Sequence, residues 1–170
     1  MKINVSLPAF LTLRDLAQRV GDLARSIATG WNVEHRETGR HRFPWNSLDY
    51  SGFTFTGSGS MTWTVDQADQ NLYEYRLIDD TLEIRWRIRS TDVGGTASNE
   101  LRISFPAGYL AAADSANTHW YSDAGTEGVG FAGTLAGDTF IRLYKLGSGN
   151  WTLTTSDNTS TAGYLAIRVQ

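Results

Sequence analysis

The feature that most constrains the fold is a change of hydrophobic period near residue 50. Between Ala9 and Gly30, apolar or small residues recur every three or four positions, which is the spacing of one helical face. From Tyr50 onward the period falls to two, the alternation of a half-buried β-strand. The chain of 170 residues is therefore expected to join one short helix to a domain made of strands.

The alternation is clearest between residues 81 and 89, where apolar and charged side chains alternate. The apolar row is Leu82, Ile84, Trp86 and Ile88. Further short strands, separated by Gly-, Asp-, Ser- and Asn-containing turns, are predicted at 52–56, 61–65, 72–78, 100–105, 118–122, 128–135, 139–146, 150–155 and 162–169. This pattern is typical of an antiparallel sandwich or barrel, whereas a nucleotide-binding α/β fold is excluded because no βαβ unit can be drawn.

Residues 12–30 carry the helical signal, with Thr12 and Asp15 spaced as in a capping box and Gly30 as a stop. The stripe keeps strict a/d spacing, and its members are Leu13, Leu16, Val20, Leu23 and Ile27. A helix this short is marginal alone in water, so its stripe must be buried. The narrow stripe favours association with copies of itself over packing against the chain's own body, which would usually require a wider apolar face.

Residues 1–11 lack a helical period, and Pro8 restrains the residue before it to an extended conformation. We expect an extended arm suited to lying on another protein, with the anchoring side chains Ile3, Val5, Leu7, Pro8 and Phe10. The net charge of −3 argues against nucleic acid as a partner, and no apolar run is long enough to span a membrane. The chain has no cysteine, so disulfides and thiol chemistry are excluded.

The junction, residues 31–49, concentrates charged and aromatic side chains, including His35 and His41. A zinc-protease helix needs two histidines one turn apart, but these two are separated by six positions and by Gly39. We therefore predict no metal site within one chain and no cofactor. A site on a three-fold axis, with His35 and His41 contributed by three copies, is kept as an alternative to a polar joint in which Trp45 packs on the body.

The body, residues 50–170, offers no catalytic motif, and we expect a protein without enzymatic activity. A pair of carboxylates for glycoside hydrolysis cannot be recognised from sequence, and 57–60 does not match a nucleophile elbow. Arginines at 85, 87 and 89 share a strand face, which favours a solvated face or a subunit contact over a phosphate site. Trp120 and Tyr121 are candidate contacts for a sugar ligand, with packing as the alternative.

Several motifs carry a resemblance to a known group of proteins. They are the turn-rich segment 53–65, the segments 75–78 and 81–86, the segment 94–108, and the Asn-Val-Glu-His and Gly-Arg-His elements of the junction. Over residues 12–170 the sequence resembles small structural proteins and fibre-head domains of tailed bacteriophages. The resemblance implies a tumour-necrosis-factor-like jelly-roll body of about 8–10 strands, a short trimeric coiled-coil stem and a place on a virion.

The expected function is therefore that of a non-enzymatic virion protein. A homotrimeric capsid decoration, cement or short head-fibre protein is favoured because the chain is short, and its expected partner is the major capsid protein. The alternative is the receptor-binding tip of a tail fibre that recognises a host surface glycan. A tail fibre usually needs a longer shaft and an adaptor-binding part, and neither is found in the sequence.

Overall fold

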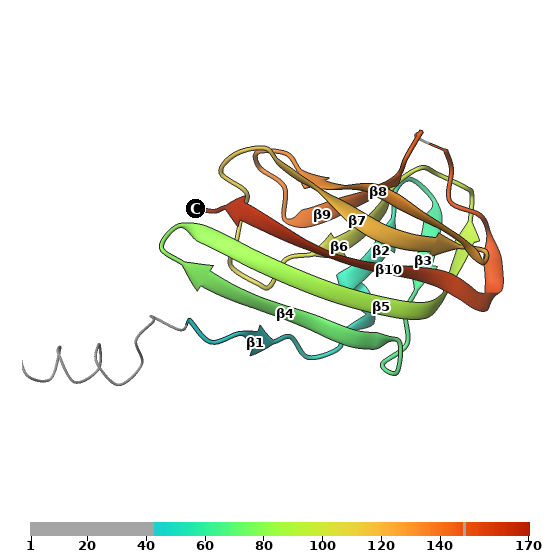
Figure 1. Cartoon of the computed structure of the whole chain (residues 1–170), viewed down its shortest axis with the longest axis horizontal. Helices are drawn as coiled ribbons and strands as arrows, with labels where there is room; N and C mark the ends of the chain where they lie inside the picture. The colour runs from blue at the N-terminus through green and yellow to red at the C-terminus, as the bar shows by residue number, and fades with distance from the viewer. Residues whose placement is uncertain (1–42, 148) are drawn as a thin grey trace, which may run out of the picture. The chain divides into compact units, whose positions relative to one another are not determined.

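The computed structural model describes residues 43–147 and 149–170, which form an all-β domain (Figure 1). The arm at 1–11, the heptad helix at 12–30 and most of the 31–49 junction, including His35 and His41, lie outside the described residues. The predictions made for those segments, among them the coiled-coil stem, remain predictions.

Within the described residues, ten strands and one short 3-10 turn account for the regular structure. They are β1 (Asn46–Ser47), η1 (Gly52–Thr54), β2 (Phe55–Gly57), β3 (Met61–Thr64), β4 (Gln70–Ile78), β5 (Thr81–Gly95), β6 (Leu101–Ser104), β7 (Ser115–Asp123), β8 (Thr126–Thr134), β9 (Phe140–Lys145) and β10 (Thr154–Arg168). The named strand pairings in this part of the chain are antiparallel, which confirms the predicted all-β antiparallel class.

The strands form one continuous curled sheet in the order β1-β4-β5-β10-β7-β8-β9-β6-β2, and β3 pairs with the far end of β5 (Figure 1). The two longest strands, β5 and β10, have 15 residues each and pair with one another at the centre. The pairing therefore shows a single sheet that curls around the core, and the jelly-roll arrangement remains a prediction.

The core lies on the inner face of this sheet, and two predicted apolar rows supply much of it. The row on β5 is fully buried, with Leu82, Ile84 and Ile88 at 0% exposure. On β3 and just after it, the alternating side chains Met61, Trp63 and Val65 are each 3% exposed. These two rows confirm the burial expected from their period of two.

The predicted strand at 52–56 is wrong in its first half, because residues 52–54 form the turn η1. The backbone N–H of Thr54 donates to the carbonyl of Ser51 (2.9 Å), which closes the turn. Phe53 and Phe55 were expected on one face, but the turn separates them. Phe55 is 2% exposed in the core, whereas Phe53 is 93% exposed.

Two other boundaries also differ from expectation. The predicted strand ended at residue 89, but β5 continues through Gly95 because β3 provides it with a new pairing partner, Met61 opposite Gly95. A strand was predicted at 150–155, but regular pairing begins only at Thr154, the first residue of β10. In both cases the long-range partner decides the outcome, and residue preference alone does not.

The buried His119 on β7 contacts β10 and β9 through its two ring nitrogens. Its Nδ1 lies 2.9 Å from Oγ1 of Thr161 on β10, and its Nε2 lies 3.1 Å from the carbonyl oxygen of Tyr144 on β9. Glycines make room for the ring, since a Cβ at Gly130 would lie 2.7 Å from Nε2 and one at Gly163 would lie 2.9 Å from the Cβ of His119. Burial lowers the pKa of His119 below its usual value, so the ring is neutral at pH 7.

The end of the junction seats on the strands β4 and β5. The ring of Trp45 lies under two guanidinium groups, 4.5 Å from the Cζ of Arg76 and 4.3 Å from the Cζ of Arg85. Each arginine also pairs with a glutamate of the adjacent strand, Arg76 with Glu83 and Arg85 with Glu74. Cation–π contacts with these two paired arginines therefore hold Trp45 against the sheet, at the point where the chain enters it.

Candidate binding surface

The outer face of β7, β8 and β10 carries a block of side chains without charge, which we call the uncharged face. Side chains at alternate positions of these strands, together with the residue that follows β8, point away from the core. The members are Ala116, Thr118, Trp120, Val129, Phe131, Gly133, Leu135, Ala162, Tyr164 and Ala166.

The strand register brings these residues into contiguous rows across the sheet. Trp120 lies between Val129 on β8 and Ala162 on β10, and Gly133 lies between Ala116 on β7 and Arg142 on β9. The outward apolar side chains of β8 and of the residue after it are unusually accessible, with exposures of 54% for Val129, 51% for Phe131 and 51% for Leu135. A grouped set of exposed apolar side chains marks an interaction surface more often than isolated ones do.

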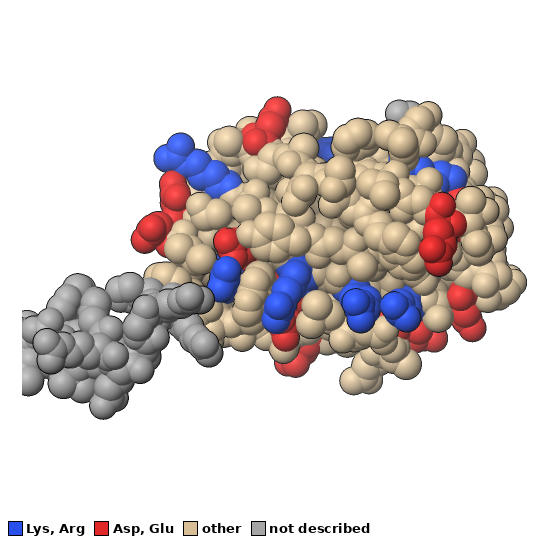
Figure 2. All heavy atoms as spheres, in the orientation of Figure 1, with Lys and Arg blue, Asp and Glu red and all other residues tan. Residues whose placement is uncertain are grey.

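The space-filling view shows this face as a broad area without charged atoms (Figure 2). Charged atoms in that view lie mainly along the lower margin and at the two ends. On β5, next to β10, the outward positions are charged, and Arg87 and Arg89 are exposed there. A charged margin beside an apolar block is the arrangement found in protein interfaces, where charge is depleted at the centre.

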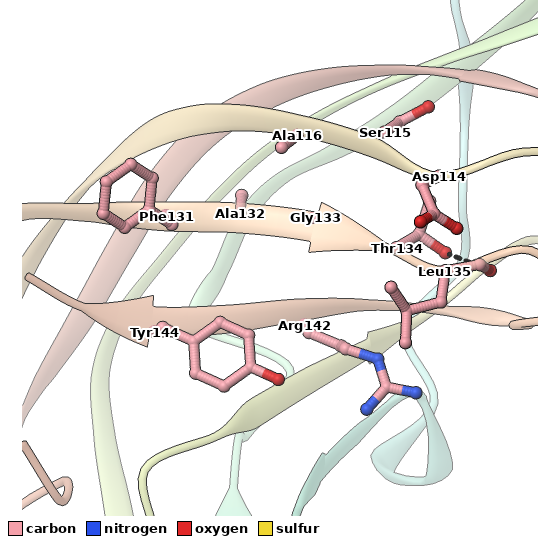
Figure 3. Close-up of a pocket in the computed structure, with 10 residues that line it drawn as sticks. All are labelled: Asp114, Ser115, Ala116, Phe131, Ala132, Gly133, Thr134, Leu135, Arg142 and Tyr144. Atoms are coloured by element: carbon pink, nitrogen blue, oxygen red, sulfur yellow. Dashed lines mark hydrogen bonds between the residues drawn. The ribbon is translucent and has the colours of Figure 1, made fainter. Parts of the chain in front are cut away.

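A hollow opens in the uncharged face where the outward side chains are smallest (Figure 3). Its floor is formed by Gly133 and Ala116, which are paired across β8 and β7. Phe131 and Leu135 stand on either side of Gly133 along β8, and Tyr144 closes the side toward β9. The cavity measures about 440 Å³ and its lining is predominantly apolar. The alternation Phe-x-Gly-x-Leu therefore creates the hollow, because the glycine provides no side chain to fill it.

Hydrogen bonds and ion pairs fix the wall on β9. The guanidinium of Arg142 donates twice to Asp138, through Nε to Oδ2 and through Nη2 to Oδ1 at 2.8 Å each, and its Nη1 donates to both carboxylate oxygens of Glu100. The hydroxyl of Tyr144 donates to the same glutamate. Burial acts to raise the pKa of Glu100, but the hydrogen bonds from Tyr144 and Arg102 outweigh it and hold the pKa below the usual value. The carboxylate is therefore ionised at neutral pH, and the wall is held rigid before any ligand arrives.

The two sugar-contact candidates lie on opposite sides of β7. Trp120 is half-buried on the uncharged face, whereas Tyr121 points inward, with its ring centre 5.5 Å from that of the buried Trp151. The structure therefore does not bring Trp120 and Tyr121 together on one ligand surface. On β5, Arg85 pairs with Glu74 and stacks on Trp45.

Sequence reasoning did not single out the residues of the hollow. The segment 128–135 was recognised as a strand, but its apolar positions did not reveal which face they would occupy. The structure buries Gly130 and Ala132 and exposes the larger Val129 and Phe131. The available signal was the alternation itself, in which the large residues Val129 and Phe131 share one face and the small residues Gly130 and Ala132 share the other. Such a strand is expected to pack against other atoms on both of its faces.

Within 43–147 and 149–170, no group of three or more His, Asp or Glu side chains is placed to hold a metal ion. No helix among the described residues is long and apolar enough to cross a membrane.

No protein-family model matches the sequence, and no curated protein matches it significantly. Among solved structures, the chain is similar to the head domain of the lactococcal phage bIL170, whose report asks whether the receptor-binding domains of lactococcal phages share a common fold. The match has a TM-score of 0.43 and 15% identity, and it covers 76% of this chain and 100% of that domain.

Proposed function

We propose that this chain is a non-enzymatic structural protein of a bacteriophage virion that acts as a homotrimer. In the favoured form it is a capsid decoration, cement or short head-fibre protein that attaches to the major capsid protein through its N-terminal part. The observation that carries the self-association is the uncharged face, with its half-exposed Val129, Phe131 and Leu135. The virion assignment is supported by the resemblance of the 53–65 and 94–108 motifs to phage structural proteins.

The exposed face is explained best if another protein covers it. Val129, Phe131 and Leu135 leave about half of each side chain in water, and covering them gains free energy in proportion to the apolar area removed. The heptad stripe at 13–27 offers a second apolar surface suited to copies of the same chain. A homotrimer would bury both apolar surfaces against copies of the same chain, because the stem and the body would associate about the same axis.

Two measurements test this function. Sedimentation equilibrium of the full chain should give a mass of three times 18.8 kDa. Cryo-electron microscopy of phage particles should then show trimers on the capsid, and removal of residues 1–11 should release them. A monomer at micromolar concentration, or unchanged binding to the particle after the truncation, would contradict the trimer or the anchoring role respectively.

The alternative function is the receptor-binding tip of a tail fibre that recognises a host surface glycan. One observation favours it: the rigid hollow presents Phe131 and Tyr144 beside the polar groups of Asp114 and Ser115. Sugar rings pack their apolar faces on aromatic side chains and use their hydroxyls for hydrogen bonds. Binding of the fluorescently labelled trimer to host cells, lost after enzymatic removal of surface polysaccharide, would select this alternative over the decoration protein.

A further inference from the structure

The hollow in the uncharged face has a counterpart elsewhere on the same chain. Residues 50–65, which include η1, β2 and β3, contain no charged side chain. Much of this segment is exposed, namely Gly52, Phe53, Thr56, Gly59, Ser60, Thr62 and Thr64. The described part of the chain therefore carries a second uncharged surface, distinct from that of β7, β8 and β10.

Phe53 projects from this second surface. The two residues that follow it, Thr54 in η1 and Phe55 in β2, are buried and hold it in place, and the hydrogen bond from Thr54 to Ser51 closes the turn. The segment is also tied to the body by the Tyr50 hydroxyl, which donates to the carbonyl of Val65 (2.6 Å). At 93% exposure, the ring of Phe53 is almost entirely in water. A rigidly displayed aromatic ring loses little entropy when a partner binds it.

Phe53 does not occupy the hollow of its own chain. The hollow is lined by residues of the β7, β8 and β9 region, and Phe53 is not among them. The turn η1 instead contacts β6, and the neighbouring β2 and β3 lie behind β10 in the view of Figure 1. The projecting ring and the hollow therefore lie on different surfaces, so one copy can use both at once with two different neighbours.

We infer that Phe53 of one copy fills the hollow between Phe131 and Leu135 of the next copy. The contact is heterologous, because one surface of the chain meets a different surface of its neighbour, and such contacts generate a ring when the rotation closes. This inference rests on the proposed homotrimer and adds to it the partner residue that completes the hollow. The 440 Å³ cavity has room for an aromatic ring, and its lining is predominantly apolar. The two charged side chains that line it already have partners, since Arg142 pairs with Asp138 and Glu100 and the Asp114 carboxylate accepts a hydrogen bond from the backbone N–H of Ala136. The segment 50–65 brings no charge to the contact.

The uncharged face is too small to form a stable interface alone, which supports the presence of the second contact surface. Three strands about 4.8 Å apart and seven residues of about 3.4 Å each cover a plane of roughly 14 by 24 Å, or about 340 Å². A stable interface usually buries about 800 Å² on each partner. A flat contact between uncharged faces alone would therefore be small, whereas insertion of η1 and the neighbouring β2–β3 surface into the hollow increases the buried area.

Photo-crosslinking of the full chain tests the inference. Phe53 is replaced by the photoreactive amino acid p-benzoylphenylalanine, and the protein is irradiated and separated on a denaturing gel. A closed ring should give covalent dimers and trimers but no larger species. Mass spectrometry should place the crosslinks on the residues of the hollow, with Phe131, Leu135 and Ala116 as the expected sites. The matched control carries the photoreactive residue at Leu77, which is 39% exposed at the end of β4 and should give no crosslinked trimer.

The outcome separates this inference from the proposed function. A native mass of three chains with crosslinks mapped outside the hollow would overturn the Phe53 contact and leave the trimer standing. A native mass of one chain would overturn both. A ladder extending beyond three chains would refute the closed ring.

Two substitutions give a second readout without a crosslinker. Phe53→Ser removes the projecting ring, and Ala116→Trp fills the hollow from an exposed position without touching the core. Each variant should weaken trimer association by about 100-fold while leaving the midpoint of urea unfolding of the dissociated chain within a small margin of the parent. Unchanged association in both variants would refute the contact, whatever the crosslinking result.

Discussion

The uncharged face makes a quantitative prediction for Phe131→Ser. Complete burial of a phenylalanine side chain is worth about 1.5–3 kcal/mol, and 51% of this side chain is exposed in the single chain. Covering the exposed half should therefore contribute about 1 kcal/mol to each interface. A trimer with cyclic symmetry has three equivalent interfaces, so the loss should be about 3 kcal/mol for the assembly. Since 1.4 kcal/mol is a factor of ten, the overall association constant should fall by about 100-fold.

The assay is sedimentation equilibrium over a range of chain concentrations, because it reports the association constant directly. The substitution also removes the buried half of the ring, so the free energy of unfolding of the chain should fall by about 1 kcal/mol. Urea unfolding measured below the dissociation concentration separates this effect from association. Circular dichroism should show an unchanged all-β spectrum, which confirms that the variant is folded.

Leu77→Ser is the matched control, because Leu77 is a partly exposed apolar residue that lies outside the uncharged face. It should destabilise the chain modestly and leave the association constant unchanged. Equal association constants for the parent and Phe131→Ser would refute the assignment of this face to self-association. An equal loss in both variants would show that the effect comes from general destabilisation.

Two further predictions concern the stability of the body. Asp123→Ala should lower the free energy of unfolding in urea by about 3 kcal/mol, because it removes a buried ion pair. Asp123 is 5% exposed, and its carboxylate accepts hydrogen bonds from Lys145 Nζ (2.6 Å) and from the backbone N–H and hydroxyl of Thr152. The control is Asp80→Ala, which breaks an exposed pair with Arg168 and should lower the free energy of unfolding by less than about 1 kcal/mol. Burial lowers the pKa of His119 in the folded chain, so the unfolded chain takes up the proton at a higher pH than the folded chain does. The contribution of His119 to the free energy of unfolding should therefore be constant above about pH 6.5 and fall as the pH drops below it. His119→Asn should be less stable at every pH and should lose that slope between pH 7 and pH 5; a slope that persists would assign the pH dependence to other groups.

The sequence predicted the parts of the fold that local alternation determines. On β5, the apolar row is interrupted by a charge at every second position, so only one face can enter the core, and Leu82, Ile84 and Ile88 are completely buried. An Asp-containing turn between the strands predicted at 72–78 and 81–89 followed from residue type as well, and Asp79 adopts a positive φ of 52° there.

The remaining parts depend on contacts that a single sequence does not reveal. Residues 52–56 alternate as a strand would, yet hydrogen bonding to Ser51 and burial of Thr54 turn the chain at η1 and display Phe53. On β8, the residues of adjacent strands decide which face points into the core, because His119 fills the space on the inner side that a larger residue at Gly130 would need. The hollow was therefore not predictable, since its existence depends on which face of β8 points outward.

The body and the predicted stem each offer a limited surface, and their combination is what favours a trimer. The stripe from Leu13 to Ile27 spans little more than two heptads, which is marginal for a coiled coil alone. Joined to associating bodies, the three helices would experience a local concentration on the order of millimolar, so their association becomes an intramolecular step. Leu16→Asp with Leu23→Asp should therefore shift dissociation to higher chain concentrations by at least about tenfold without changing the urea unfolding of the β body. Sedimentation that shows the same dissociation profile for parent and double variant, together with equal thermal melting, would show that the heptad stripe does not contribute to assembly and that the body associates alone.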